Sequence, residues 1–97
     1  IAQQEPEKAE TEYRKAVKLN PSDAGALSGL ALTYEIQNSN LDIALTFAKE
    51  SIMIEPDNPL FRSRLGNIYV KQNRNDLADI EFKKAKEFQK LHKPEVM

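Results

Sequence analysis

The chain lacks cysteine and tryptophan, and it has only 3 glycines and 1 histidine among its 97 residues. Without cysteine it forms no disulfide, no thiolate metal site and no cysteine nucleophile, although this absence identifies no compartment. No apolar run approaches the roughly 20 residues that a membrane-spanning helix needs. An excess of one charge is also missing, because the formal net charge is -1. The overall charge therefore favours neither nucleic acid nor an anionic membrane as a partner.

Catalytic motifs are missing too. The sequence has no glycine-rich phosphate loop, no HExxH, no GxSxG and no pair of histidine ligands. The lone histidine, His92, lies in a charged tail near the end of a predicted helix, where a solvated side chain is the usual role. The sequence therefore predicts a protein with no enzymatic activity, no cofactor and no metal.

The charges that are present are unevenly distributed along the chain. Residues 1–23 sum to -1, residues 24–58 to -4 and residues 59–97 to +4. The last segment contains the lysine-rich stretch "KKAKEFQKLHK". Its lysines follow Phe82 and are interspersed with Phe88 and Leu91, a pattern that resembles a surface for RNA or a membrane. Acidic residues interrupt it, however. We therefore interpret the stretch as an amphipathic terminal helix, and we expect neither nucleic acid nor a membrane as a partner.

The chain repeats itself at an offset of 35 residues, which separates Pro21 from Pro56. At this offset "LNPSD" falls on "IEPDN". Self-similarity at this period indicates stacked supersecondary units. Further pairs align in the same way: Ala9 with Ala44, Leu30 with Leu65, Ala31 with Gly66 and Tyr34 with Tyr69.

Within each unit the apolar residues recur at helical spacing, and no strand alternation competes with it. The pattern predicts five helices, at about residues 6–18, 24–37, 41–54, 59–72 and 76–91. Their short connections predict antiparallel hairpins. Ala31 and Gly66 lie where the two helices of a hairpin would cross, and a small residue there lets the backbones approach.

Asparagines stand at three of the expected helix starts. Asn58 precedes Pro59, an order typical of an N-cap followed by proline in the first turn. Asn40 and Asn75 are candidate caps for the helices that follow them.

On these residues the chain resembles a tetratricopeptide repeat protein. The first-helix signature of that family is seen at Leu27, Leu30, Ala31 and Tyr34, and again at Leu65, Gly66 and Tyr69. The second-helix signature is seen at Ala9, Tyr13, Ala16 and Pro21; at Ala44, Ala48, Ser51 and Pro56; and at Ala78, Phe82 and Ala85. The resemblance implies an all-α fold of antiparallel helix-turn-helix repeats stacked in a right-handed superhelix. It implies one domain over residues 1–97, with the second helix of a truncated repeat (1–23), a full repeat (24–58) and a full repeat with the terminal helix (59–97).

The sequence departs from the family pattern in places. Leu27 and Arg62 occupy the positions of the usual tryptophan, and the middle unit has one extra residue near "QNSN". Polar Asp79 and Lys86 replace apolar residues of the preceding repeat, so we expect the array to end at the last helix. At the other end we expect further repeats upstream, because the first helix lacks its hairpin partner. We therefore expect Tyr13 and Val17 to be partly exposed.

The resemblance also implies a function. In such arrays the first helix of each repeat lines a concave groove that binds extended peptides or partner helices, so we predict a non-catalytic scaffold for protein–protein interaction. The predicted groove residues are Gly25, Ser28, Leu32, Glu35, Ser63, Asn67 and Lys71. Asn67 offers a donor and an acceptor to a peptide backbone, Lys71 a charge for a carboxylate and Leu32 an apolar contact.

Two alternatives stay open. Exposed faces of the terminal helices would make the chain a self-association or assembly element, a homo-oligomer in the simplest case. The chain could also present substrate to an enzyme domain of a longer protein. A third idea, RNA reading by a pentatricopeptide array, is disfavoured by the repeat closures and by the charge of -4 in the middle unit.

Overall fold

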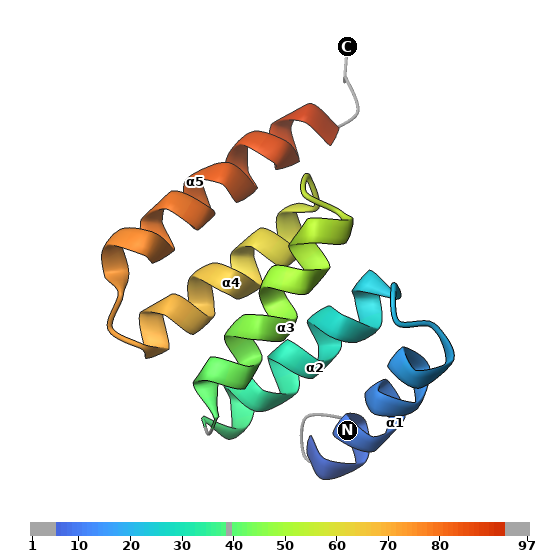
Figure 1. Cartoon of the computed structure of the whole chain (residues 1–97). Helices are drawn as coiled ribbons and strands as arrows, with labels where there is room; N and C mark the ends of the chain where they lie inside the picture. The colour runs from blue at the N-terminus through green and yellow to red at the C-terminus, as the bar shows by residue number, and fades with distance from the viewer. Residues whose placement is uncertain (1–5, 39, 93–97) are drawn as a thin grey trace.

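The computed structural model describes residues 6–38 and 40–92, and in that part of the chain every regular element is an α-helix. The helices are α1 (Pro6–Leu19), α2 (Ala24–Gln37), α3 (Leu41–Ile54), α4 (Pro59–Lys71) and α5 (Asn75–His92). Consecutive helices pack against each other, as α2 with α3 and α4 with α5, so that hairpins stack side by side (Figure 1). The predicted all-α fold is confirmed, and each predicted helix is present with its bounds within one residue.

The start of α4 follows the sequence prediction in detail. The Asn58 side chain accepts hydrogen bonds from the backbone N–H of Leu60 at 2.9 Å and of Phe61 at 3.3 Å. Pro59 occupies the first turn, where the N–H that it lacks would have no partner inside the helix. The predicted N-cap is confirmed.

The other two asparagines act differently. Asn40 precedes α3 but makes no capping hydrogen bond with its side chain, and its backbone is left-handed at φ 53°. Asn75 is already the first residue of α5, and the carbonyl of Arg74 accepts from Ala78 N–H instead. Asn40 therefore occupies the predicted N-cap position of α3 without a side-chain cap bond, whereas the expectation that Asn75 caps α5 is wrong. Asn38 and Asn73 also have positive φ, so asparagine serves these turns chiefly by tolerating the left-handed region.

The core runs through the stacked hairpins as one apolar cluster. Its members come from α2, α3, α4 and α5, and Tyr13 and Val17 of α1 pack against it while staying half-buried. These two residues are therefore partly exposed, as expected. The buried set is Ala24, Leu30, Ala31, Tyr34, Ala44, Ala48, Ile52, Phe61, Leu65, Ile68, Tyr69 and Ala78.

A glycine lets the two helices of the last hairpin approach closely. A Cβ atom on Gly66 would lie 2.5 Å from the ring of Phe82, so α4 offers a side-chain-free site to the aromatic residue of α5. In the preceding hairpin the corresponding pair is Ala31 and Ala48, both buried. Each hairpin thus fills its crossing point, one with glycine and phenylalanine, the other with two alanines.

A second glycine serves a contact between α1 and α2. A Cβ atom on Gly29 would lie 2.5 Å from the ring of Tyr13. Beside this contact the Tyr34 hydroxyl donates to the Glu10 carboxylate at 2.7 Å, and Arg14 bonds both the Tyr34 oxygen and Glu10. The interface between α1 and α2 therefore combines ring packing with an ionic cluster.

Arg62, which stands where the family pattern has tryptophan, is held by three groups. Its guanidinium forms an ion pair with Glu81 at 3.1 Å and donates to the carbonyl of Pro56 at 3.0 Å. It also lies 5.7 Å from the centre of the Phe88 ring, within range of a cation–π interaction. The arginine thus joins α4 to α5, as a large apolar residue would, through polar contacts.

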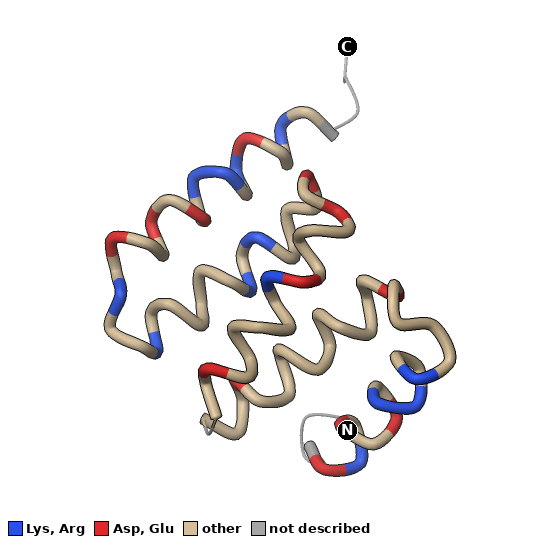
Figure 2. Tube along the Cα trace, viewed as in Figure 1, with Lys and Arg blue, Asp and Glu red and all other residues tan. Residues whose placement is uncertain are grey.

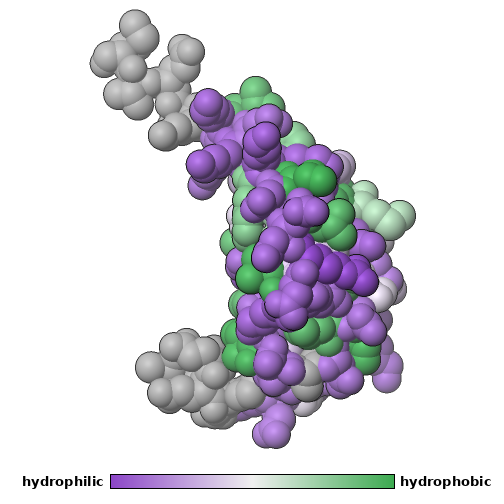
Figure 3. Space-filling model, turned by 90° about the vertical axis from the view of Figure 1, so that its left-hand side faces the viewer, coloured by the Kyte–Doolittle hydropathy of each residue, from purple (hydrophilic) through white to green (hydrophobic). Residues whose placement is uncertain are grey.

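Charge and apolar surface are distributed unequally among the helices. Charged residues follow α1 and α5 along their lengths, whereas α2 is almost free of them (Figure 2). Asp79 and Lys86 of α5 are exposed, in keeping with a polar terminal face. Seen from the side, the described part of the molecule forms a shallow arc, and apolar residues appear as small separate patches among polar ones (Figure 3).

Candidate partner-binding groove

The first helices of neighbouring repeats, α2 and α4, pack directly against each other although α3 separates them in sequence. In Figure 1 α3 crosses in front of both. Two polar links join them. Arg64 donates to the Ser28 hydroxyl at 2.7 Å, and Lys71 donates to the backbone carbonyl of Glu35 at 2.7 Å. Lys71 also forms an ion pair with the Glu35 carboxylate at 3.2 Å, so both links run from a cation on α4 to a group on α2.

Helical spacing explains why the two links lie on the same face. Ser28 and Glu35 are seven residues apart, as are Arg64 and Lys71, and seven residues make about two turns of α-helix. Each link joins residues 36 apart in sequence, close to the 35-residue offset of the repeat. The links are therefore a consequence of stacking similar units with complementary polar residues at neighbouring positions.

Two of the predicted residues lie between the linked positions of α2 and α4. Leu32 lies on α2 between Ser28 and Glu35, and Asn67 lies on α4 between Arg64 and Lys71. Leu32 is half-buried and Asn67 is exposed. Between the two linked positions, α2 thus offers a half-buried apolar side chain and α4 an exposed amide.

The remaining predicted residues differ in accessibility. Gly25 is exposed and Ser63 is half-buried, so both can be reached from solvent. Ser28, in contrast, has no exposed surface, and Glu35 is only 9% exposed. Because their polar atoms already accept bonds from α4, these two residues hold Arg64 and Lys71 in place.

Lys71 also complements the end of α2. The Glu35 carbonyl belongs to the last turn of that helix, where it accepts from the Asn38 N–H at 3.0 Å and has a second lone pair for Lys71. A cation there interacts favourably with the negative end of the helix dipole. Lys71 therefore stabilises α2 while its side chain stays partly exposed, at 34%.

Arg64 is the functional candidate that the sequence analysis did not name. Burial lowers the pKa of its guanidinium, and the nearby Tyr13 hydroxyl and Glu35 carboxylate act in the opposite direction. Within residues 6–38 and 40–92 no carboxylate lies within ion-pair distance of it. Arg64 lies 36 residues after Ser28, one more than the repeat offset. This spacing indicates that the two residues occupy neighbouring positions in adjacent repeats.

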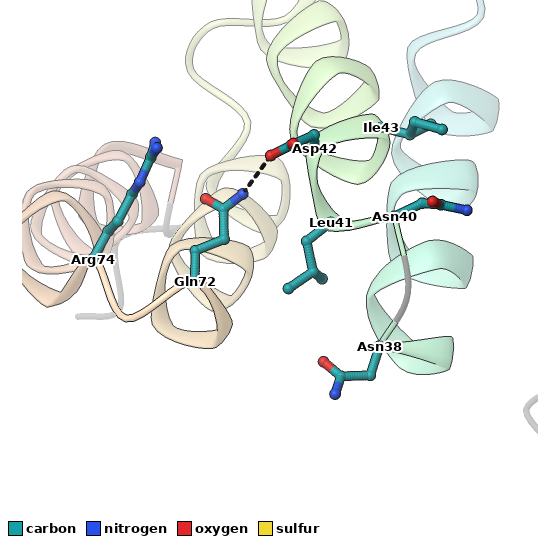
Figure 4. Close-up of a pocket in the computed structure, with 7 residues that line it drawn as sticks. All are labelled: Asn38, Asn40, Leu41, Asp42, Ile43, Gln72 and Arg74. Carbon is teal, nitrogen blue, oxygen red and sulfur yellow. Dashed lines mark hydrogen bonds between the residues drawn. The ribbon is translucent and has the colours of Figure 1, made fainter.

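A second depression lies at the turns between helices. It is lined by Asn38, Asn40, Leu41, Asp42, Ile43, Gln72 and Arg74 (Figure 4). Gln72 donates to the Asp42 carboxylate at 3.2 Å, while the carbonyl oxygen of the same amide is buried without a partner. The depression is wide and open, so it is a weaker candidate than the face between α2 and α4.

Other kinds of site find little support in the described residues. They contain no group of three or more His, Cys, Asp or Glu side chains that could hold a metal ion. No helix among them is long and apolar enough to cross a membrane. The side chain of His92, at the end of α5, lies outside the described residues.

Comparison with known proteins gives one finding. A family model described as tetratricopeptide repeat matches residues 1–23 and 62–90, which together make up more than half of the chain. The residues between the two matches include the middle unit with its extra residue near "QNSN". No curated protein matches the chain.

Proposed function

Because the chain belongs to the tetratricopeptide repeat family, we propose that it binds a peptide or partner segment along the face formed by α2 and α4. Repeats of this kind generally mediate protein–protein interactions, and the family is typically a non-catalytic scaffold. The observation that carries the proposal is the pair of links between α2 and α4, which fix two helices at a set separation. A rigid surface loses little conformational entropy on binding, so the partner segment bears most of the ordering cost.

The residues of this face divide into two roles. Leu32 offers apolar contact, and Ser63 and Asn67 offer hydrogen bonds to a peptide backbone. Lys71 bonds the Glu35 carbonyl and carboxylate and has a third N–H donor for a carboxylate of the partner. Ser28 and Glu35 do not touch the partner in this proposal. They position the cations of α4.

The test is a binding experiment with a displayed library of random peptides, selected on the intact 97-residue chain. The affinity of the selected peptides is then measured for three variants, Leu32→Ala, Asn67→Ala and Lys71→Ala. We expect each variant to weaken binding by about 5- to 50-fold, the range typical of interface residues that cost ~1–2 kcal/mol. Circular dichroism and thermal unfolding show whether each variant remains folded.

Matched controls lie on other faces of the molecule. Met53→Ala removes an apolar side chain that is 81% exposed on α3, and Gln89→Ala removes an exposed amide on α5. Both should leave affinity unchanged. If the three variants on α2 and α4 bind like the wild type, or if Met53→Ala weakens binding as much as they do, the proposed face is wrong.

One observation favours self-association as a second candidate. Leu77 and Ile80 lie one turn apart on α5 and are 41% and 48% exposed. Two neighbouring apolar side chains on a terminal helix could pair with a second copy of the chain. Sedimentation over a wide concentration range tests this function: the mass should rise with concentration for the wild type and stay monomeric for Ile80→Lys. A monomer at the highest concentration would exclude it.

A further inference from the structure

The charges on the face between α2 and α4 do not balance. Helix α4 carries three cations, Arg62, Arg64 and Lys71, and no acidic residue. Arg62 is neutralised by Glu81 of α5, which leaves Arg64 and Lys71. The only acidic residue of α2 is Glu35, and it lies 3.2 Å from Lys71. Two cations therefore share one carboxylate.

Arg64 is the cation without a direct counter-ion. It makes a hydrogen bond to the neutral Ser28 hydroxyl, whereas a guanidinium carries five N–H donors. It is half-buried, so water solvates it less completely than a surface arginine. A half-buried guanidinium is stabilised most by a carboxylate, which its planar fork can bind through two parallel hydrogen bonds.

The position of Leu32 predicts a second feature of the partner, an apolar side chain near the carboxylate. It follows Ser28 by four residues on α2, which places it about 6 Å further along the helix axis. Asn67, one turn after Arg64 on α4, lies at a similar level and offers an amide to the partner backbone. A partner that reaches both Arg64 and Leu32 therefore lies along the face.

We infer that the partner segment carries an acidic side chain that pairs with Arg64 and an apolar side chain, about 6 Å away, that packs on Leu32. In an extended segment the two residues are two positions apart, and in a helical segment three or four. We assign the acidic group to an Asp or Glu side chain of the segment. A free C-terminal carboxylate has the same chemistry, and the two libraries described below distinguish these sources. This inference rests on the proposed function and specifies the partner that the face selects.

The experiment selects peptides twice on the intact chain, once from a library displayed with blocked C-termini and once from a library with free C-termini. Peptides selected from the blocked library should share an Asp or Glu at the predicted distance from an apolar residue. Exchange of that acid for its amide should weaken binding to the wild type about 10- to 100-fold, the value of a charge-assisted hydrogen bond. Arg64→Gln keeps hydrogen-bonding capacity but removes the charge. It should bind the acidic peptide more weakly than the wild type by the same factor, and it should bind the acid and amide forms with equal affinity.

Lys83→Gln is the matched control, because it removes an exposed cation from α5. It should leave affinity and the preference for the acid unchanged. Affinity for the wild type should also fall as salt rises, and less steeply for Arg64→Gln. A charge exchange gives independent support: Arg64→Glu should bind the selected peptides poorly and recover when their acid is replaced by lysine.

The outcomes separate the inference from the proposed function. Peptides that depend on Leu32 and Asn67 but show no preference for an acid would overturn the inference and leave the function standing. Peptides selected only with a free C-terminus, whose carboxylate Arg64 binds, would overturn the assignment to a side chain. Peptides whose affinity no variant of α2 or α4 changes would overturn both. If Arg64→Gln does not fold, the acid-to-amide exchange in the peptide, measured with the wild-type chain, still tests whether the face prefers an acid.

Discussion

The Tyr34 hydroxyl in α2 and the Glu10 carboxylate in α1 are joined by a hydrogen bond of 2.7 Å that connects the first helix to the rest of the array. Tyr34 is itself buried and lies parallel to the Phe47 ring of α3, with ring centres 6.2 Å apart. Arg14 completes the cluster by bonding Glu10 at 3.0 Å. One tyrosine of α2 thus links α2 to both neighbouring helices, to α1 through its hydroxyl and to α3 through its ring.

This cluster predicts how stability depends on pH. The hydrogen bond from Tyr34, then that from Arg14, lowers the pKa of Glu10 below its usual 4.5. A carboxyl group whose pKa is lower in the folded state stabilises the fold above its unfolded pKa, and loses this contribution as the pH falls through the folded pKa. We expect the free energy of unfolding to decrease below about pH 4.5, and Glu10→Gln to remove that part of the decrease.

Urea unfolding followed by circular dichroism at a series of pH values measures this effect. Glu10→Gln should be less stable than the wild type at neutral pH, and the difference should narrow in acid. Glu12→Gln is the control, because the Glu12 side chain is 66% exposed and its carboxylate comes no closer than 4.0 Å to the Lys15 ammonium. Equal pH profiles for the two variants would contradict the role of Glu10.

The crossing of α4 and α5 predicts a compensating pair of substitutions. Gly66→Ala places a Cβ atom 2.5 Å from the Phe82 ring, so we expect a net destabilisation of about 1–2 kcal/mol despite the better helix propensity of alanine. Phe82→Ala leaves a cavity and should cost about 2–3 kcal/mol for this half-buried ring. The double variant recreates the alanine pair of the preceding hairpin. Its loss in free energy of unfolding should be smaller than the sum of the two single losses by about 1 kcal/mol or more.

A double-mutant cycle in urea checks this prediction. Gly25→Ala is the control for the propensity effect, since its Cβ atom would meet only Asp23 Oδ1 at an ordinary 3.5 Å. It should be neutral or slightly stabilising. Additive effects of the Gly66 and Phe82 substitutions would show that the close approach is unimportant.

Removing one partner of the ion pair between Arg62 and Glu81 should cost more stability than replacing both. Their side chains are 14% and 11% exposed, so removing one partner leaves the other charge buried and unpaired. We expect Glu81→Gln to cost about 2–3 kcal/mol, and the double replacement of Arg62 and Glu81 by leucine to cost less than that.

Lys84→Gln is the matched control, because its ammonium lies 4.0 Å from Glu81 and its side chain is 45% exposed. It should change stability by less than about 0.5 kcal/mol in the same thermal or urea unfolding experiment. If Glu81→Gln is as mild as Lys84→Gln, the pair contributes no more than a surface ion pair.

The asparagines at helix starts should respond to substitution in different ways. Asn58→Ala removes two capping hydrogen bonds and should cost about 1 kcal/mol, whereas Asn58→Asp should retain most of the stability. Asn40 makes no such bond and has a φ of 53°, so Asn40→Gly should be neutral while Asn40→Ala should cost about 1 kcal/mol through backbone strain. Thermal unfolding distinguishes the two, and a loss at Asn40→Gly as large as at Asn58→Ala would contradict this division.

Local and periodic features of the fold could be predicted from the sequence. The spacing of apolar residues fixed the helices to within one residue, and the repeat offset identified Gly66 as a crossing point. Both depend on backbone periodicity and on residue size, which a single sequence displays directly. The capping role of Asn58 was equally local, because the proline after it restricts the backbone.

Contacts between repeats were harder to predict. Ser28 and Glu35 have the right spacing for an exposed face, but residues of α4 cover them, and only the stacking geometry shows this. Arg62 was recognised as a departure from the family pattern, whereas its partners Glu81 and Pro56 depend on how α5 and the preceding turn fold back. Asn40 and Asn75 were assigned as caps from residue type alone, which does not distinguish a side-chain cap from a left-handed backbone.

The contact of Tyr13 with Gly29 limits how α1 can slide along α2. A shift by one helical turn towards the C-terminal end of α2 would bring the ring against Thr33, four residues further on, whose side chain is already buried. A shift in the opposite direction would bring it against Gly25, where a Cβ atom is again absent. Packing of the Tyr13 ring therefore opposes slippage of the first helix towards the C-terminal end of α2. A misregistered state would have α1 one turn closer to the start of α2, and it would lack the hydrogen bond between Tyr34 and Glu10.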